Sequence, residues 1–203
     1  MSPLDGGILP ADRKYQLLLS LSQRMRATLD LDEVLGHVLD AVHAAVHYDA
    51  AGIFVLNRAS VGTRPADPRQ HIAGIVQRGF DGRPPENDIM LMSGHGLVGH
   101  VIGTGETINL GDVTLDPRYV VGRMQTRSEM AVPILGADEI IGALNLESDR
   151  RNAFTDEDLE ILYVFADAAS AAIGRAMLHH ELMERRRVEH QMHLAQAVQS
   201  RLL

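Results

Sequence analysis

The apolar residues at the start of the chain recur at helical spacing in two consecutive segments. Residues 11–29 predict a first helix, with apolar positions at Leu17, Leu18, Leu21, Met25 and Leu29. A second helix is predicted from Leu31 to His47. Asp30 stands at its N-cap position and Glu33 follows three residues later, which is a common signal for a helix start.

The period then changes from that of a helix to that of a strand. Ala50–Asn57 and His71–Phe80 are short apolar segments that predict two strands. Glu129–Leu135 and Glu139–Glu147 predict a hairpin, and its second arm should place one set of side chains on a single face: Ile140, Gly142, Leu144 and Leu146. A further short strand is expected around Asn109. Hairpin connections favour an antiparallel sheet, so we expect an α+β fold with a central antiparallel sheet of about five or six strands.

The last predicted helix has the clearest start in the chain. Thr155 is its expected N-cap, and Asp158 can bond back to the cap as in a capping box. No Pro and only one Gly, Gly174, follow up to Leu203. The helix would therefore have roughly 48 residues and a length of about 70 Å.

The apolar side of this last helix narrows after Ala176 to a thin seam. A helix with such a seam rarely stands alone in water, so we expect a parallel coiled coil in a homodimer that is held by the first and last helices. The predicted division is a loose N-terminus at 1–10, a dimerisation helix at 11–29, a sheet domain at 30–176 and a coiled-coil linker helix at 177–203.

Composition and charge exclude several classes of protein. The chain has 203 residues, of which 45% are hydrophobic, and a formal net charge of −8. An acidic chain argues against nucleic-acid binding. There is no Cys, so disulfides and a catalytic thiol are not expected. We see neither a signal peptide nor an uninterrupted apolar stretch of membrane-spanning length, and we expect a cytoplasmic protein.

A glycine pattern at Gly94-x-Gly96-x-x-Gly99 matches the dinucleotide-binding fingerprint in form only. That fingerprint needs a strand before it and a full helix after it within a parallel crossover unit. Here the following helix can run only from Leu97 to about Ile102 before Gly103 and Gly105 end it. We interpret the glycines as residues that permit tight turns beside a short helix.

An ordered set of motifs over residues 30–176 resembles the GAF domain, a small-molecule-sensing module. The motifs are Gly94-x-Gly96-Leu97-x-Gly99-x-Val101, Thr104-Gly105, Asp112-Val113, Asp116-Pro117-Arg118-Tyr119, Ser128-Glu129-Met130-Ala131-Val132-Pro133-Ile134 and Ile141-Gly142-Ala143-Leu144-Asn145, followed by Phe154 and Asp158. The resemblance implies that the terminal helices cover one face of the sheet and that a small-molecule pocket lies on the other, under residues 81–128. We expect five residues to face this pocket: His95, Asn109, Tyr119, Ser128 and Met130.

The ligand itself is not defined by the sequence. GAF domains that bind cyclic nucleotides resemble one another in an Asn-Lys pair, where this chain has Glu147-Ser148, so a cyclic nucleotide is disfavoured. Bilin-binding relatives use a Cys that is absent here. His95 or His100 could be a haem ligand, but a lone His in a loop is more often a solvated polar residue. His190 and His193 are interpreted as part of a solvated helix face, and we expect no metal site.

The end of the chain resembles the linker helix that enters the metal-dependent serine phosphatase domain of bacterial stress and sporulation regulators. The matching residues are Leu194-Ala195, Gln199 and Leu202-Leu203. We expect a sensory module that passes a signal along the last helix to an output domain absent from this chain, with no enzymatic activity of its own. The alternatives are the sensor of a histidine kinase, or a structural dimerisation module with an unused pocket.

Overall fold

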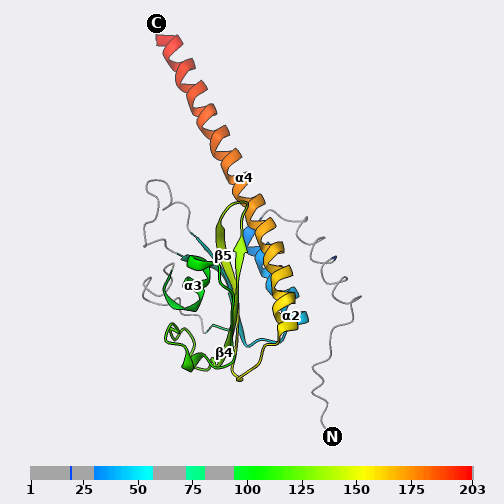
Figure 1. Ribbon diagram of the computed structural model, residues 1–203. Coiled ribbons are helices and arrows are strands. Elements are labelled where there is room, and N and C mark those ends of the chain that lie inside the picture. Colours follow the sequence, from blue (N-terminus) through cyan, green and yellow to red (C-terminus); the bar gives the residue numbers. More distant parts are fainter. Residues whose placement is uncertain (1–18, 20–29, 57–71, 81–93, 203) are drawn as a thin grey trace.

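The computed structural model describes Leu19 and residues 30–56, 72–80 and 94–202 (Figure 1). Its centre is a five-stranded antiparallel sheet in the order β2-β1-β5-β4-β3. The strands are β1 Ala50–Leu56, β2 Ile72–Arg78, β3 Ile108–Leu110, β4 Ser128–Leu135 and β5 Ile140–Ser148. The predicted α+β class and the antiparallel sheet are therefore confirmed. The predicted first helix at 11–29 lies outside the described residues, apart from Leu19.

Two helices cover one face of the sheet and a shorter helix covers the other (Figure 1). Helix α2, Leu31–Ala45, begins where predicted, because the Asp30 side chain accepts a hydrogen bond of 3.0 Å from the Glu33 amide. With α4, it buries a large apolar core against the sheet, including Leu35, Leu39, Leu144, Leu162 and Ile173. The opposite face carries α3, Gly96–Thr104, over a smaller core that includes Phe54, Leu97, Val101, Ile108 and Ala131. We call these the helix face and the α3 face.

Helix α4, Asp156–Leu202, has 47 residues and extends well beyond the sheet (Figure 1). The predicted capping box is present: the Asp158 amide donates to the Thr155 hydroxyl (3.2 Å), and the Asp158 carboxylate accepts from the Thr155 amide (2.9 Å). The segment Asp156–His179 is apolar enough, by length and a mean hydropathy of 1.4, to cross a membrane. Its buried side chains pack on the sheet, so this hydropathy has a reason within the fold: Leu162, Phe165, Ala166, Ala169 and Ile173.

The short helix α3 begins within the glycine pattern, at Gly96, and is joined to an antiparallel sheet, which rules out a dinucleotide fold for the described strands. Gly94 and Gly96 have φ values of 81° and 69°, and Gly105 caps α3 at φ 77°. These positive values confirm that the glycines serve tight turns. After β3, a single 3-10 turn, η3 Val113–Leu115, begins the loop that leads back to β4.

One prediction about the hairpin is wrong. Ile140 does not share a face with Leu144 and Leu146, because the β4–β5 register shifts between Ile134 and Leu135. Ile140 packs on the α3 face and Ile141 takes the place on the helix face. A bulge of this kind inserts one residue and reverses the alternation of side chains beyond it.

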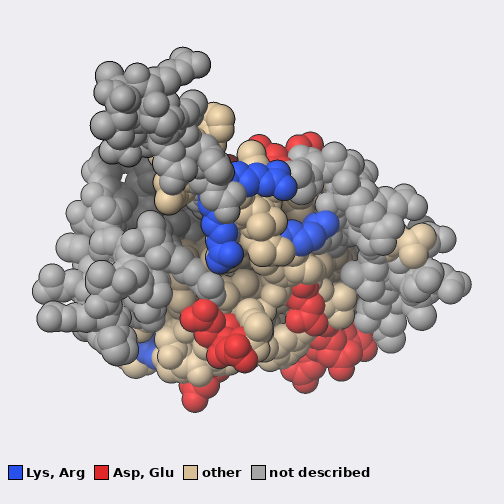
Figure 2. All heavy atoms as spheres, turned by 90° about the horizontal axis from the view of Figure 1, so that it is seen from above, with Lys and Arg blue, Asp and Glu red and all other residues tan. Residues whose placement is uncertain are grey.

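Seen from the end at which α4 leaves the sheet, charged side chains of both signs are visible (Figure 2). Most of the acidic ones lie in the lower part of the view, with a few at its upper border, and most of the basic ones lie nearer the middle. Among the described residues on this face, no continuous basic surface forms. The distribution agrees with the formal net charge of −8.

Candidate functional site

Strands β4 and β5 carry polar residues on the α3 face, at the middle of the sheet. Side chains alternate along a strand, so Met130, Val132 and Ile134 enter the core of the helix face, while Glu129 and Ala131 lie on the α3 face. Glu129 is the direct cross-strand partner of Glu147, and Asn145 lies two residues before Glu147 on the same face. The three side chains are therefore neighbours by strand register.

These residues form a buried polar cluster with Thr126. Glu129 is 3% exposed, Glu147 6% and Asn145 1%. The Asn145 amide group donates to a carboxylate oxygen of each glutamate at 3.4 Å. The Thr126 hydroxyl donates to the second carboxylate oxygen of Glu147. We refer to Thr126, Glu129, Asn145 and Glu147 as the acidic cluster.

Burial dominates the electrostatics of the acidic cluster. Loss of solvent and the neighbouring Glu147 charge raise the pKa of Glu129 well above its ordinary value. Loss of solvent also raises the pKa of Glu147, although hydrogen bonds from Thr126 and Asn145 and the charge of Arg123 oppose this shift. Two like charges on directly opposed residues repel each other. The pair therefore holds protons at a pH where exposed glutamates have lost them.

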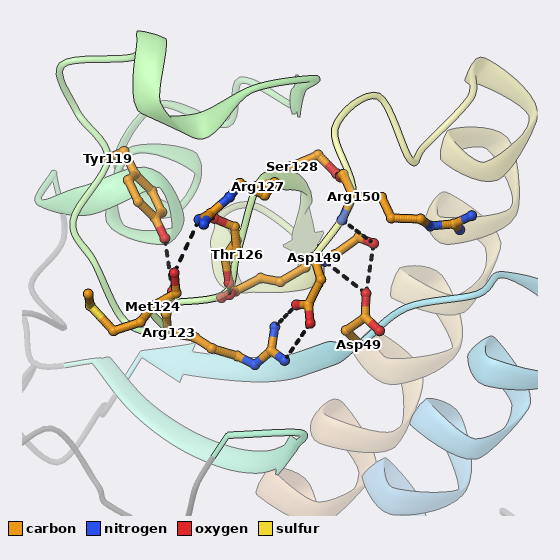
Figure 3. Close-up of polar contacts among 11 residues, drawn as sticks. Asp49, Tyr119, Arg123, Met124, Thr126, Arg127, Ser128, Asp149 and Arg150 are labelled. Carbon is orange, nitrogen blue, oxygen red and sulfur yellow. Dashed lines mark hydrogen bonds and ion pairs between the residues drawn. The ribbon is translucent and has the colours of Figure 1, made fainter.

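Tyr119 joins the cluster from the loop between η3 and β4. It is partly buried against the core of the α3 face, and its hydroxyl donates to the Arg123 carbonyl at 3.5 Å (Figure 3). Burial, with the charges of Glu147 and Glu129, raises the pKa of Tyr119 to about 12. The phenol therefore stays a neutral donor beside the two carboxyl groups.

Asn145 also has a polar atom without a partner. Its Oδ1 is buried and accepts no hydrogen bond. It lies over the backbone of Gly52, the cross-strand partner of Asn145: a Cβ at Gly52 would stand 3.1 Å from this oxygen and 2.4 Å from the Phe54 ring. A glycine at this position is therefore what allows the amide and the ring to approach the strand. A buried orphan acceptor is rare and points to a missing donor.

Ion pairs fix the loop that borders the acidic cluster. Arg123 forms a two-pronged pair with Asp149, and Asp49 accepts from the Ser148 hydroxyl and the Asp149 amide, both at 2.8 Å (Figure 3). Burial acts against ionisation of Asp49, but these two hydrogen bonds, together with neighbouring positive charges such as that of Arg123, outweigh it and lower the pKa of Asp49. Arg127 donates to the carbonyls of Met124 and Thr126 (Figure 3). Arg123 and Arg127 thus fix the second half of the loop.

A second polar group lies at the rim, between α3 and the same loop. Hydrogen bonds from Arg118 lower the pKa of Asp116 to about 2. Arg118 also contacts His100 Nε2 at 2.9 Å, and Glu106 contacts the same nitrogen at 3.0 Å. His100 is therefore already engaged through the nitrogen that a haem iron would need. Within the described ranges, no group of three or more His, Asp or Glu side chains is arranged to hold a metal.

The predicted site residues divide between the two faces. Tyr119 lies on the α3 face, and His95 is an exposed N-cap of α3 that makes no capping hydrogen bond. Met130 is in the core of the helix face, so its prediction as a pocket residue is wrong. Ser128 shares that side of β4 and donates to the Arg150 carbonyl, and Asn109 pairs with Met130 at an exposed edge. By strand alternation these two side chains also lie on the side of the sheet away from α3. Ligand contact by His95 and Tyr119 stays a prediction.

The sequence reasoning missed Glu129, Asn145 and Glu147. A signal was present, since Glu129 is the only charged residue in Ser128–Leu135 and Glu147 is the only charged residue in Ile140–Ser148. A carboxyl group in the middle of a buried strand is costly unless it has a function or a partner. That rule would have placed Glu129 on the α3 face and Met130 on the helix face.

The GAF domain sequence profile matches residues 30–173, which is more than half of the chain. The chain therefore belongs to the GAF domain family, whose members are sensory and regulatory modules. It is 26% identical over 185 residues to the dual 3′,5′-cyclic-AMP and -GMP phosphodiesterase 11A of Takifugu rubripes. That match covers 84% of this chain and 20% of the relative, so the chain spans about a fifth of the length of that protein.

Solved structures share the fold at low sequence identity. The GAF domain of a phosphoenolpyruvate-protein phosphotransferase from Coxiella burnetii aligns with a TM-score of 0.67 and 21% identity, over 85% of this chain and 99% of that one. The free methionine-R-sulfoxide reductase of Neisseria meningitidis, solved with its substrate, aligns with a TM-score of 0.68 and 18% identity, over 88% and 99%. Both regulatory modules and an enzyme are thus built on this fold, and the fold alone does not select between them.

Proposed function

We propose that this chain is a sensory module in which a small molecule binds on the α3 face and changes the packing of α4, which carries the change away from the domain. The observation that carries the proposal is the position of the acidic cluster on β4 and β5. The same two strands present Met130, Leu144 and Leu146 to the core that contains α4. Only the thickness of one sheet separates the polar site from the helix.

Direct bonds also connect α4 to the strands. The Ser170 hydroxyl donates to the carbonyl of Leu135 at the end of β4. Tyr163 of α4 is hydrogen-bonded to Thr107, next to β3, at 2.5 Å. A shift of β3 or β4 on ligand binding would therefore displace α4 at two separate turns. Such a coupling requires the ligand to interact differently with two packing states.

The exposed half of α4 supports association with a second copy of the chain. Apolar side chains beyond the sheet are about half exposed: Leu178, Leu182, Met183, Val188 and Met192. Burying a side chain of this size contributes about 1.5–3 kcal/mol. We propose a parallel homodimer along this seam, since two helices that pass a signal in the same direction must leave their domains side by side. Participation of residues 11–29 stays a prediction.

For the output, the proposal follows the linker resemblance at the end of the chain. Leu194-Ala195, Gln199 and Leu202-Leu203 favour a metal-dependent serine phosphatase domain over a histidine kinase. The phosphodiesterase and the phosphotransferase named above are relatives of which a GAF domain forms one part, which supports a regulatory role for this one. Catalysis would then reside outside residues 1–203.

The acidic cluster argues against a cyclic nucleotide as the ligand. The phosphodiesterase relative acts on cyclic AMP and cyclic GMP by its name, and a cyclic nucleotide carries a negative phosphodiester. Placing that charge beside Glu129 and Glu147, both buried, would add repulsion in a medium that screens it poorly. A haem would have to displace Glu106 and Arg118 from His100.

One experiment tests both binding and relay. The chain contains no Cys, so Arg186→Cys, on the exposed side of α4, gives a unique spin-label site in each protomer. Amines, carboxylic acids, neutral polar compounds and nucleotides are screened for compounds that raise the melting temperature. We expect at least one class to do so and to change the label-to-label distance in the dimer. A label at Asp32→Cys in α2 is the control and should keep its distance.

Two results contradict the proposal. If no class of compound raises the melting temperature, the α3 face is not a ligand site. If a compound binds and the Arg186→Cys distance is unchanged, α4 is not coupled to that site. The second result would leave a structural dimerisation module as the better description.

A further inference from the structure

The acidic cluster contains more hydrogen-bond acceptors than donors. Both carboxyl groups and the Asn145 carbonyl offer oxygens, whereas the described hydrogen bonds are donated by the Asn145 amide and the Thr126 hydroxyl, and a carboxyl group that keeps its proton adds one O–H donor. Asn145 Oδ1 is left without a donor. Turning the amide over would place Oδ1 against the two carboxyl groups, where it could accept only from a protonated one. The missing component is a group rich in N–H donors.

We propose that the ligand of the α3 face carries a cationic amine, whose N–H groups donate to Glu129, Glu147 and Asn145 Oδ1. This inference rests on the proposed function, because it names the ligand class of the same site. An ammonium or guanidinium group has only donors and a positive charge, so it supplies at one point both of the properties that the cluster lacks.

The described residues offer no internal cation that does the same. Arg123 is close enough to lower the pKa of Glu147, but its guanidinium is committed to Asp149. Arg127 is committed to backbone carbonyls of the loop. The pKa of each glutamate stays raised in spite of these neighbours, which supports a site whose countercharge is brought in from outside.

A metal ion fits this site less well than an organic amine. The described part of the chain brings only two carboxyl groups and no histidine to the cluster, and it has no arrangement of three His, Asp or Glu side chains that could hold a metal. The immediate surroundings are apolar and aromatic. The Phe54 ring stands beside Gly52 and Asn145, and Tyr119 closes the other side. Such walls suit a cation with an apolar body, because aromatic rings attract cations as well as apolar groups.

Binding of an amine should release protons. Before binding, the raised pKa of the pair keeps one or more carboxyl groups protonated at a pH where exposed glutamates are ionised. Ion pairing with a bound ammonium favours the charged carboxylates, so the carboxyl proton passes to the buffer. A neutral or anionic ligand would not cause this release.

Three probes of matched shape test the inference: phenethylamine, 2-phenylethanol and phenylacetate. Agmatine and guanidinium extend the cationic set. Binding to the full chain is measured by titration calorimetry at millimolar concentrations, in two buffers that differ in their heat of ionisation. We expect a cationic probe to bind and its apparent enthalpy to depend on the buffer. We expect the alcohol and the carboxylate of the same shape not to bind.

The variants Glu129→Gln and Glu147→Gln keep the shape of the side chains and remove their charge. Either should weaken cation binding about tenfold, the effect of losing one charge-assisted hydrogen bond. Glu139→Gln removes an exposed carboxyl group from the β4–β5 turn and is the matched control, with affinity unchanged. Circular dichroism and the melting temperature confirm that each variant is folded.

The inference is overturned if no cationic probe binds, or if phenylacetate or 2-phenylethanol binds as well as phenethylamine. It is also overturned if the affinity for the cationic probe is the same in Glu129→Gln and Glu147→Gln as in the wild type. Its failure can be separated from failure of the proposed function. If an anion binds and changes the distance between the Arg186→Cys labels, the amine inference is wrong and the proposed relay through α4 is supported. If an amine binds and the distance between the labels is unchanged, the proposed relay is wrong and the amine site is supported.

Discussion

At the residue scale, the unusual feature is a pair of glutamates placed directly opposite each other inside a sheet. Glu129 and Glu147 are both buried, and the hydrogen bonds that reach them come from Asn145 and Thr126. A buried ion without full compensation costs several kcal/mol. The fold accepts this cost at one place on the α3 face, while the equivalent positions of the helix face are apolar.

Glu129→Gln should stabilise the unliganded protein at pH 8. It removes one of two buried carboxyl groups that repel each other when ionised and keeps an acceptor of the same shape, so we expect the free energy of unfolding to rise by about 1 kcal/mol or more. Chemical denaturation with the Glu139→Gln control measures this. A loss of stability in Glu129→Gln would mean that the charge of Glu129 is already compensated in the free protein.

The pH dependence follows from the same pair. A glutamate whose pKa is raised by folding binds more protons in the folded state than in the unfolded state, so stability falls as pH rises from the ordinary glutamate range through the raised value. In the wild type, the free energy of unfolding should therefore decline over this window, and in Glu129→Gln the decline should be smaller. At lower pH, Asp116 has the opposite effect on stability. Folding lowers its pKa to about 2, so the free energy of unfolding falls as the pH drops from the ordinary aspartate range to that value.

At the element scale, most helices and strands followed from hydrophobic period and from caps. Asp30 and Thr155 mark real helix starts, and the strands of the hairpin lie within a residue of their predicted limits. The faces of β4 could not be predicted in the same way. Every residue of β4 except Leu135 is buried, because the strand is covered on both sides, so the usual alternation of apolar and polar residues is absent.

The misplaced site residues have the same physical origin. Met130 and Ser128 were assigned to the pocket by position along the chain, and only the register with β5 shows which face they occupy. The bulge at Ile140 and Ile141 depends on pairing between two strands, so neither strand alone reveals it. The Asp116-Pro117 turn before Tyr119 is visible in the sequence, so a loop could be predicted there. The ion pairs that hold this loop could not be predicted, because they join residues distant in the sequence.

Thr155→Ala should destabilise the start of α4. It removes the hydroxyl that accepts from the Asp158 amide, and the loss of an N-cap costs about 0.5–2 kcal/mol. Hydrogen exchange of the amides in the first turn of α4 should become faster, while exchange in β5 follows only the global change. Glu160→Ala, one turn further and exposed, is the control. Equal protection in both variants would show that the capping box does not hold this end.

At the scale of the whole molecule, a domain of two unequal faces is joined to a helix much longer than the sheet requires. The larger core lies under α2 and α4, and the smaller one lies with the acidic cluster under α3. Beyond the sheet, α4 exposes an apolar seam that no described residue of the same chain covers. On the proposed function, the α3 face is the surface for a ligand, and the exposed seam of α4 is the surface for a second copy of the chain.

Leu182→Glu together with Met192→Glu should convert the dimer to a monomer at micromolar concentration. Both side chains are about half exposed on α4, and glutamates at these positions would place like charges across the proposed seam. Sedimentation equilibrium measures the mass. The melting temperature of the sheet domain should change little, because neither side chain belongs to its core. An unmutated chain that sediments as a monomer would exclude the dimer.

The length of α4 has a mechanical consequence. About 29 residues separate Ile173, the last side chain of its buried core, from the end of the helix at Leu202, a distance of about 44 Å at 1.5 Å per residue. The helix is therefore a lever whose short arm rests on the sheet and whose long arm extends beyond it. A tilt of about five degrees at the sheet displaces the far end by about 4 Å on this geometry. A displacement too small to disturb the packing of the core is thus enlarged, at the end of the helix, to the width of a side chain.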